Sequence, residues 1–126
     1  MTPAIALAFC ALLGLLAVFQ LLLIIGLPFG RFAWGGQNPV LPARQRIGSA
    51  VAIVVYAAFA VVALERAALV SILPEPLIAV VAMWVIAAYL LVSVLPNLAS
   101  KSKYERRTMA PVSLALAGLA FLVAVS

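Results

Sequence analysis

Four side chains with polar groups stand inside long apolar stretches of this sequence, where chemistry is least expected. Gln20 is the only amide in such a stretch, and Tyr56, Trp84 and Tyr89 are aromatic residues with a polar atom. Polar groups are costly in lipid, so those that occur there are informative. Tyrosine and tryptophan usually lie at the membrane interface, so mid-span positions for Tyr56 and Trp84 indicate burial between helices. We interpret the four as a candidate intramembrane cluster that either pins helices together or lines a small pocket.

Two members of this cluster stand at similar depths. Gln20 precedes Leu27, the end of the first apolar stretch, by seven residues, and Tyr89 precedes Leu95, the end of the third, by six. At the rise of an α-helix both side chains lie about 10 Å from the same membrane face. We therefore expect them to be neighbours within reach of a hydrogen bond, which would stabilise the bundle by about 1 kcal/mol or less.

The connections between the apolar stretches carry a second set of candidate residues. Phe29, Phe32 and Trp34 suit the headgroup layer, and the adjacent glycines permit a sharp turn or a close backbone approach. The segment from Phe29 to Gln37 is either interfacial or re-entrant. The candidate site for a lipid headgroup, a partner or a small anion comprises Arg31, Trp34, Gly35, Gly36, Arg44, Arg46, Lys101, Lys103, Arg106 and Arg107.

A further pair of charges, Glu65 and Arg66, follows the second apolar stretch. Adjacent helical residues point about 100° apart, so the two cannot share one face. We interpret them as a candidate outer interface, in which both side chains reach the membrane surface. A coupling or substrate carboxylate at Glu65 is the alternative.

Several chemistries find no support in the sequence. Histidine, the commonest general base and metal ligand, is absent, and Cys10 is the single cysteine. Gly35 and Gly36 follow no strand and precede no P-loop lysine. We predict no catalytic residue, no metal and no cofactor. The net charge is +5, and the charged residues flank apolar segments. This arrangement favours anionic lipid headgroups over nucleic acid as the partner.

The elements that hold these residues are predicted to be four transmembrane helices. Of 126 residues, 68% are hydrophobic and 9% are charged, too few charges to cover a soluble surface of this size. About 20 apolar residues cross the hydrocarbon as a helix, and four strands could not close a barrel. We expect an all-α transmembrane bundle forming one membrane domain over residues 1–126. The expected spans are 4–27, 47–64, 77–95 and 109–126, the last about 27 Å long.

Prolines mark the expected ends of these spans. Pro28 and Pro96 each follow a leucine at the end of a span, where a helix cannot easily continue. Pro111 is expected in the first turn of the fourth helix, where its missing N–H costs nothing. Pro74 and Pro76 bracket the short connection between the second and third spans.

The basic residues predict which way the chain is inserted. Seven of the eight lie in the first and third connections, and only Arg66 lies in the second. The positive-inside rule makes the side with seven cytoplasmic and places both termini outside. We expect a multi-pass protein of the bacterial cytoplasmic (inner) membrane whose basic loops contact anionic headgroups.

A group of scattered residues resembles small four-helix bacterial integral membrane proteins. They are Trp34-Gly35-Gly36, Leu41-Pro42, Arg46, Ser49, Asn97, Ser100, Ser102, Glu105-Arg106 and Pro111. The resemblance covers most of the chain and implies the fold but no activity, because that family has none assigned. Size and helix count are also similar to the small multidrug resistance transporters, but those carry a glutamate in the first helix where this span has only Gln20.

These observations favour a non-enzymatic membrane protein that binds a partner, a lipid or further copies of itself. The alternative is a small homo-oligomeric transporter or channel, because four helices alone enclose little aqueous volume. A lipid-modifying enzyme is the weakest hypothesis, since no nucleophile stands with a base. A lipid substrate seated against Arg44, Arg46 and Glu105 would revive it.

Overall fold

The computed structural model describes residues 2–126 and contains four long α-helices and no β-strand within that range. Each helix is long and apolar enough to cross a membrane, which confirms the predicted all-α fold. The helices are α1 (Thr2–Ile24), α2 (Ala43–Arg66), α3 (Pro76–Leu98) and α4 (Lys103–Val125). Two short 3₁₀ helices, η1 (Gly30–Phe32) and η2 (Trp34–Gly36), lie in the connection between α1 and α2.

The predicted end of the third span is wrong, because α3 continues past Pro96 to Leu98. A proline removes its own N–H donor, yet the residues around it can still hold the last turn. Here the amide of Ala99 donates to the carbonyl of Leu95 at 2.9 Å. The side chain of Asn97 donates to the carbonyl of Ser93 at 3.4 Å. The last turn of α3 therefore keeps its hydrogen bonds.

The fourth helix also begins earlier than predicted, and Pro111 lies in its interior rather than in its first turn. The helix starts after Ser102, whose hydroxyl accepts a hydrogen bond from the amide of Glu105 at 3.4 Å. This N-cap satisfies one of the donors that a helix start leaves free. With 23 residues, α4 is about 35 Å long. The fourth helix therefore has as many residues as α1 and α3, and one fewer than α2.

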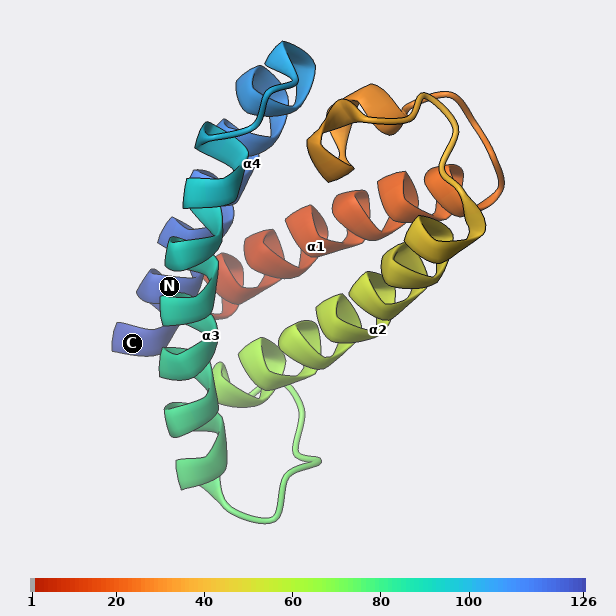
Figure 1. Ribbon diagram of the computed structural model, residues 1–126. Helices are drawn as coiled ribbons and strands as arrows, with labels where there is room; N and C mark the ends of the chain where they lie inside the picture. The colour runs from red at the N-terminus through yellow and green to blue at the C-terminus, as the bar shows by residue number, and fades with distance from the viewer. Residues whose placement is uncertain (1) are drawn as a thin grey trace.

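The four helices form two hairpins that separate toward one end (Figure 1). α1 lies beside α2, α3 lies beside α4, and α1 also contacts α4. The end with the α1–α2 and α3–α4 connections holds seven of the eight basic residues, and we name it the basic end. At the opposite end the two hairpins pack closely around Phe9, Ala63, Met83, Ala120 and Val123, which have no exposed surface. The alanines at this crossing let the backbones approach closely.

The connection between α1 and α2 folds back over the basic end. The amide of Gly30 donates to the carbonyl of Pro39 at 2.8 Å, which closes the connection into a compact loop. Leu23 and Leu41 are buried with Ala33 beneath this loop, and Phe19 and Phe29 pack against them. The loop is therefore anchored by its own apolar cluster and covers the end of the bundle.

The closure at Gly30 can be tested by adding one methyl group. A Cβ there would stand 1.8 Å from the carbonyl oxygen of Asn38, which is backbone and cannot move aside alone. Gly30→Ala should destabilise the protein by about 1 kcal/mol or more in thermal unfolding in detergent. Gly14 lies on α1 with no atom near its Cβ position, so Gly14→Ala is the matched control. It should be neutral or stabilising by up to about 1 kcal/mol. Equal stability of the two variants would contradict the described loop closure.

Candidate functional site

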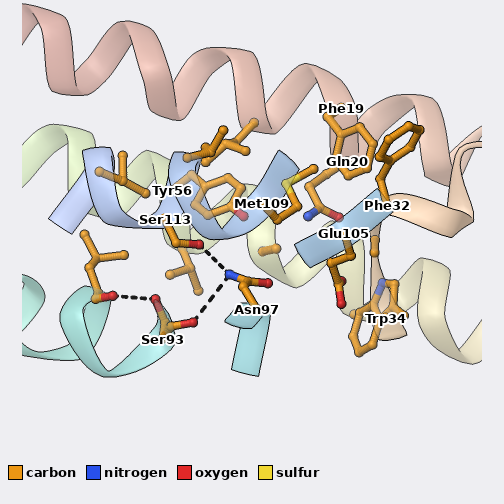
Figure 2. A pocket seen from close by; sticks show the side chains of 18 of the residues that line it. Phe19, Gln20, Phe32, Trp34, Tyr56, Ser93, Asn97, Glu105, Met109 and Ser113 are labelled. Atoms are coloured by element: carbon orange, nitrogen blue, oxygen red, sulfur yellow. Dashed lines mark hydrogen bonds between the residues drawn. The ribbon is translucent and has the colours of Figure 1, made fainter. Parts of the chain in front are cut away.

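A cavity of about 410 Å³ lies between the two hairpins at the basic end, beneath the folded loop. All four helices and the loop contribute to its wall (Figure 2). Its volume falls within the range of small-molecule sites in proteins. The separation of the hairpins creates this space, because the side chains that pack them together lie toward the other end.

The polar side chains of the cavity come from every helix. They are Gln20 of α1, Trp34 of η2, Tyr56 of α2, Tyr89, Ser93 and Asn97 of α3, and Glu105 and Ser113 of α4. The side-chain nitrogen of Asn97 donates to the hydroxyl of Ser113 and to the carbonyl of Ser93, as the dashed lines in Figure 2 mark. The hydroxyl of Ser93 donates in turn to the carbonyl of Leu90 at 2.6 Å. This network ties α3 to α4 along one side of the cavity.

Glu105 is the one charged side chain that lines the cavity. It lies in the first turn of α4 and is only 8% exposed. The arginine side chains that donate hydrogen bonds within residues 2–126 donate to the backbone carbonyls of Leu41, Ser126 and Ser100 and not to this carboxylate. The positive end of the helix dipole favours a carboxylate at this position. Glu105 was expected in the connection before the fourth span, 109–126. The signal that could have placed it on a helix is the pattern Ser102-Lys103-Tyr104-Glu105, a capping box before an apolar run.

Aromatic rings form much of the remaining wall. They belong to Phe19, Phe32, Trp34, Tyr56, Phe59 and Tyr89. The Trp34 indole lies against Gly48 of α2, where a Cβ would stand 2.6 Å from the ring. Its N–H donates to the hydroxyl of Ser49 at 3.4 Å. The glycine therefore makes room for the indole at the edge of the cavity.

The mouth of the cavity is marked by its three exposed lining residues, Trp34, Val51 and Tyr89, which are 43%, 57% and 58% exposed. Val51 lies on α2 and Tyr89 on α3, so the cavity opens sideways between these two helices. In a membrane this side faces lipid. A molecule dissolved in the bilayer could therefore reach the cavity without passing through water.

The candidate intramembrane cluster is divided by the fold. Gln20, Tyr56 and Tyr89 line one cavity, and of these Gln20 and Tyr89 were expected at a shared depth. No hydrogen bond joins Gln20 to Tyr89, and the Gln20 Oε1 is buried without a partner among residues 2–126. Tyr89 instead packs edge-on against the ring of Phe59, with 6.0 Å between ring centres.

Trp84 lies outside the cavity, so its expected burial between helices is wrong. It is 44% exposed and meets the edge of Phe121, with 5.8 Å between ring centres. Trp84 precedes Ser93 by nine residues, which is about two and a half helical turns. The two residues therefore lie on opposite faces of α3, and Ser93 faces the cavity.

The predicted headgroup residues do gather at one end of the bundle. Arg31 lies over the rings of Phe32 and Tyr104, at 5.1 and 4.9 Å from their centres. The Arg46 Nε donates to the carbonyl of Leu41 at 2.7 Å. The exposed basic residues of this end are Arg31, Arg44, Lys101, Lys103, Arg106 and Arg107. Gly36 packs against Ser102, whereas Gly35 lies in open space.

Glu65 and Arg66 both bind backbone at the opposite end. The Glu65 Oε1 accepts hydrogen bonds from the amides of Ile72 and Leu73 at 2.6 and 2.8 Å. The Arg66 guanidinium donates to the carbonyl of Ser126. A second, larger cavity of about 560 Å³ lies here, but its two charged residues already hold the α2–α3 connection and the end of α4. The pair therefore serves the fold.

A double-mutant cycle can test the network on the cavity wall. Asn97→Ala and Ser113→Ala each remove one side of the same hydrogen bond. Their coupling free energy should be about 0.6 kcal/mol and at most about 1.7 kcal/mol, measured by unfolding in detergent. Ser71→Ala, at an exposed position of the α2–α3 connection, is the control and should not couple to Asn97→Ala. If the effects of Asn97→Ala and Ser113→Ala on the free energy of unfolding were fully additive, the two side chains would not be coupled. The hydrogen bond between them would then not be part of the site.

Comparison with protein-family models, with curated proteins and with solved structures finds no match to this chain. The predicted resemblance to small four-helix bacterial membrane proteins is therefore neither supported nor contradicted, and it stays a prediction. The function of the protein must be inferred from the cavity itself.

Proposed function

We propose that the protein is a non-enzymatic membrane protein that binds a small amphipathic molecule in the cavity at its basic end. The observation that carries the proposal is the cavity, which combines polar groups from all four helices with an aromatic wall and a mouth between α2 and α3. Intramembrane polar groups are costly, and their convergence on an open space is typical of ligand sites. Purely structural contacts would not need the space.

A homo-oligomeric transporter or channel is the alternative function, and the packing of the bundle bears on it. A pore needs a path through the whole bundle. The opposite half is filled by Phe9, Met83 and Val123, which have no exposed surface. Such interiors are close-packed, so the cavity ends at this core. These contacts favour binding over flow through a single copy of the chain.

The ligand site can be tested by filling it. Ala52 lines the cavity, whereas Ala57 lies on the exposed surface of the same helix. We expect native mass spectrometry of the gently extracted protein to find one small molecule bound to the parent and to Ala57→Trp. The indole of Ala52→Trp should displace that molecule. Equal occupancy in both variants would overturn the proposal. The proposal would also be overturned if the unsubstituted protein carried no small molecule but a different protein in fixed stoichiometry. That result would indicate an accessory role.

We also propose that the basic end is cytoplasmic, with both termini outside, in the inner membrane of a bacterium. Seven of the eight basic side chains at this end support that orientation through the positive-inside rule. Six of them are exposed, and near the membrane surface each contributes about 1 kcal/mol of attraction to anionic headgroups.

Cysteine labelling of intact cells tests the orientation. In a Cys10→Ala background, Glu75→Cys should react with an impermeant thiol reagent added from outside. Gln37→Cys should react only after the membrane is opened, because it lies at the basic end. Both positions are exposed, so access to the thiol does not differ between them. The reverse pattern of labelling would invert the topology.

A further inference from the structure

We propose that the ligand of this cavity is an amphipathic organic ammonium ion with at least one N–H group, paired with the carboxylate of Glu105. The inference rests on the proposed function and names the chemical class of its ligand. Three properties of the cavity support it: its charge, the direction of its hydrogen bonds, and its aromatic wall.

The charge of the cavity wall is negative. Glu105 is the one charged side chain among the lining residues and is only 8% exposed. A buried carboxylate costs free energy unless a positive group or hydrogen-bond donors compensate it. The helix start supplies part of that compensation. The nearby cations are engaged elsewhere, because Arg106 donates to the carbonyl of Ser100 at 2.9 Å and Arg31 lies over two rings.

One acceptor of the cavity is buried without a donor in the described part of the chain. Three donors of the cavity are already used within the protein: the amide nitrogen of Asn97, the hydroxyl of Ser93 and the indole N–H of Trp34. The Gln20 Oε1, in contrast, is an acceptor that is buried with no partner among residues 2–126. Together with the carboxylate of Glu105, it offers two acceptors to a ligand, beside the hydroxyls of Tyr56, Tyr89 and Ser113, which can donate. An N–H or O–H group on the ligand would satisfy the buried Gln20 Oε1.

The aromatic wall favours a cation over a neutral donor. Rings of Phe19, Phe32, Trp34 and Tyr56 surround the same space as Glu105 and Gln20 in Figure 2. An aromatic ring attracts a cation over its face, and the attraction grows when the cation is desolvated. The apolar parts of the same rings suit the hydrocarbon body of an amphipathic amine. The sideways mouth gives such a molecule access from the bilayer.

A structural role for Glu105 is the competing explanation, and one substitution separates the two. In a capping box, glutamine at this position serves the helix start as well as glutamate does. Glu105→Gln should therefore keep α4 intact while it removes the charge. Glu75→Gln is the matched control, because Glu75 is exposed at the opposite end of the bundle.

The experiment follows the fluorescence of Trp34 in the full chain. The chain has two tryptophans, so Trp84→Phe leaves Trp34 at the cavity as the single reporter. Three probes of similar size are titrated near neutral pH: 2-phenylethylamine, which is then cationic, neutral 2-phenylethanol and anionic phenylacetate. We expect the amine to bind about tenfold or more tightly than the alcohol, and phenylacetate to bind weakest. Glu105→Gln should remove the advantage of the amine and keep the binding of the alcohol, whereas Glu75→Gln should change neither.

Each outcome decides between the two proposals. Equal binding of amine and alcohol, or a preference that survives Glu105→Gln, would overturn the ammonium ligand and leave the cavity as a binding site. Tightest binding of phenylacetate would also overturn it and would indicate a site for anions. If no probe gives a signal that Ala52→Phe, a bulky substitution that adds no tryptophan to the cavity, abolishes, the ligand site fails as well. Binding of the alcohol to Glu105→Gln shows that this variant is folded, so loss of structure cannot imitate the expected result.

Discussion

The hydroxyl of Ser102 makes the contact on which the basic end of this protein depends. It accepts a hydrogen bond from the amide of Glu105 and so begins α4, and it donates to the carbonyl of Arg31 in the loop between α1 and α2. One side chain thus joins the start of the second hairpin to the loop of the first. Gly36 packs directly against Ser102, where a Cβ would stand 2.6 Å away. The loop and the helix start are therefore fixed relative to each other.

This contact places the two most unusual residues of the site. Glu105 stands three residues after Ser102, so the position of the cap decides where the carboxylate lies. Trp34 lies two residues before Gly36 and has a positive φ of 54°, which is uncommon for a residue with a side chain. Such strain persists only where surrounding contacts impose it, and it is frequent at functional sites. Here the loop holds the indole against Gly48, at the mouth of the cavity.

The two ends of the bundle show different uses of the same four helices. At the opposite end small residues bring the helices together, and Glu65 and Arg66 at the end of α2 bind backbone groups. At the basic end the hairpins separate, and Gln20 and Glu105 line the space between them. The exposed cations at this end suit a headgroup layer, while the carboxylate lies inside. An amphipathic cation would pass lipid phosphates and then meet Glu105, and so would find an opposite charge at both places.

The sequence by itself determined the four helices and the clustering of charge at one end, because both follow from local properties. A long apolar stretch must be helical in lipid, and basic residues are visible in the connections wherever the helices pack. It also indicated the shared depth of Gln20 and Tyr89, which needs only the helical rise. The tertiary structure alone decided which face of each helix is buried. These helices are apolar on all sides, so no periodic pattern could show that Trp84 faces outward or that Ser93 faces a cavity. The tertiary structure also decided the burial of Glu105. In the sequence this carboxylate stands beside four basic residues and is expected to be solvated, and only the distant loop at Arg31 covers it.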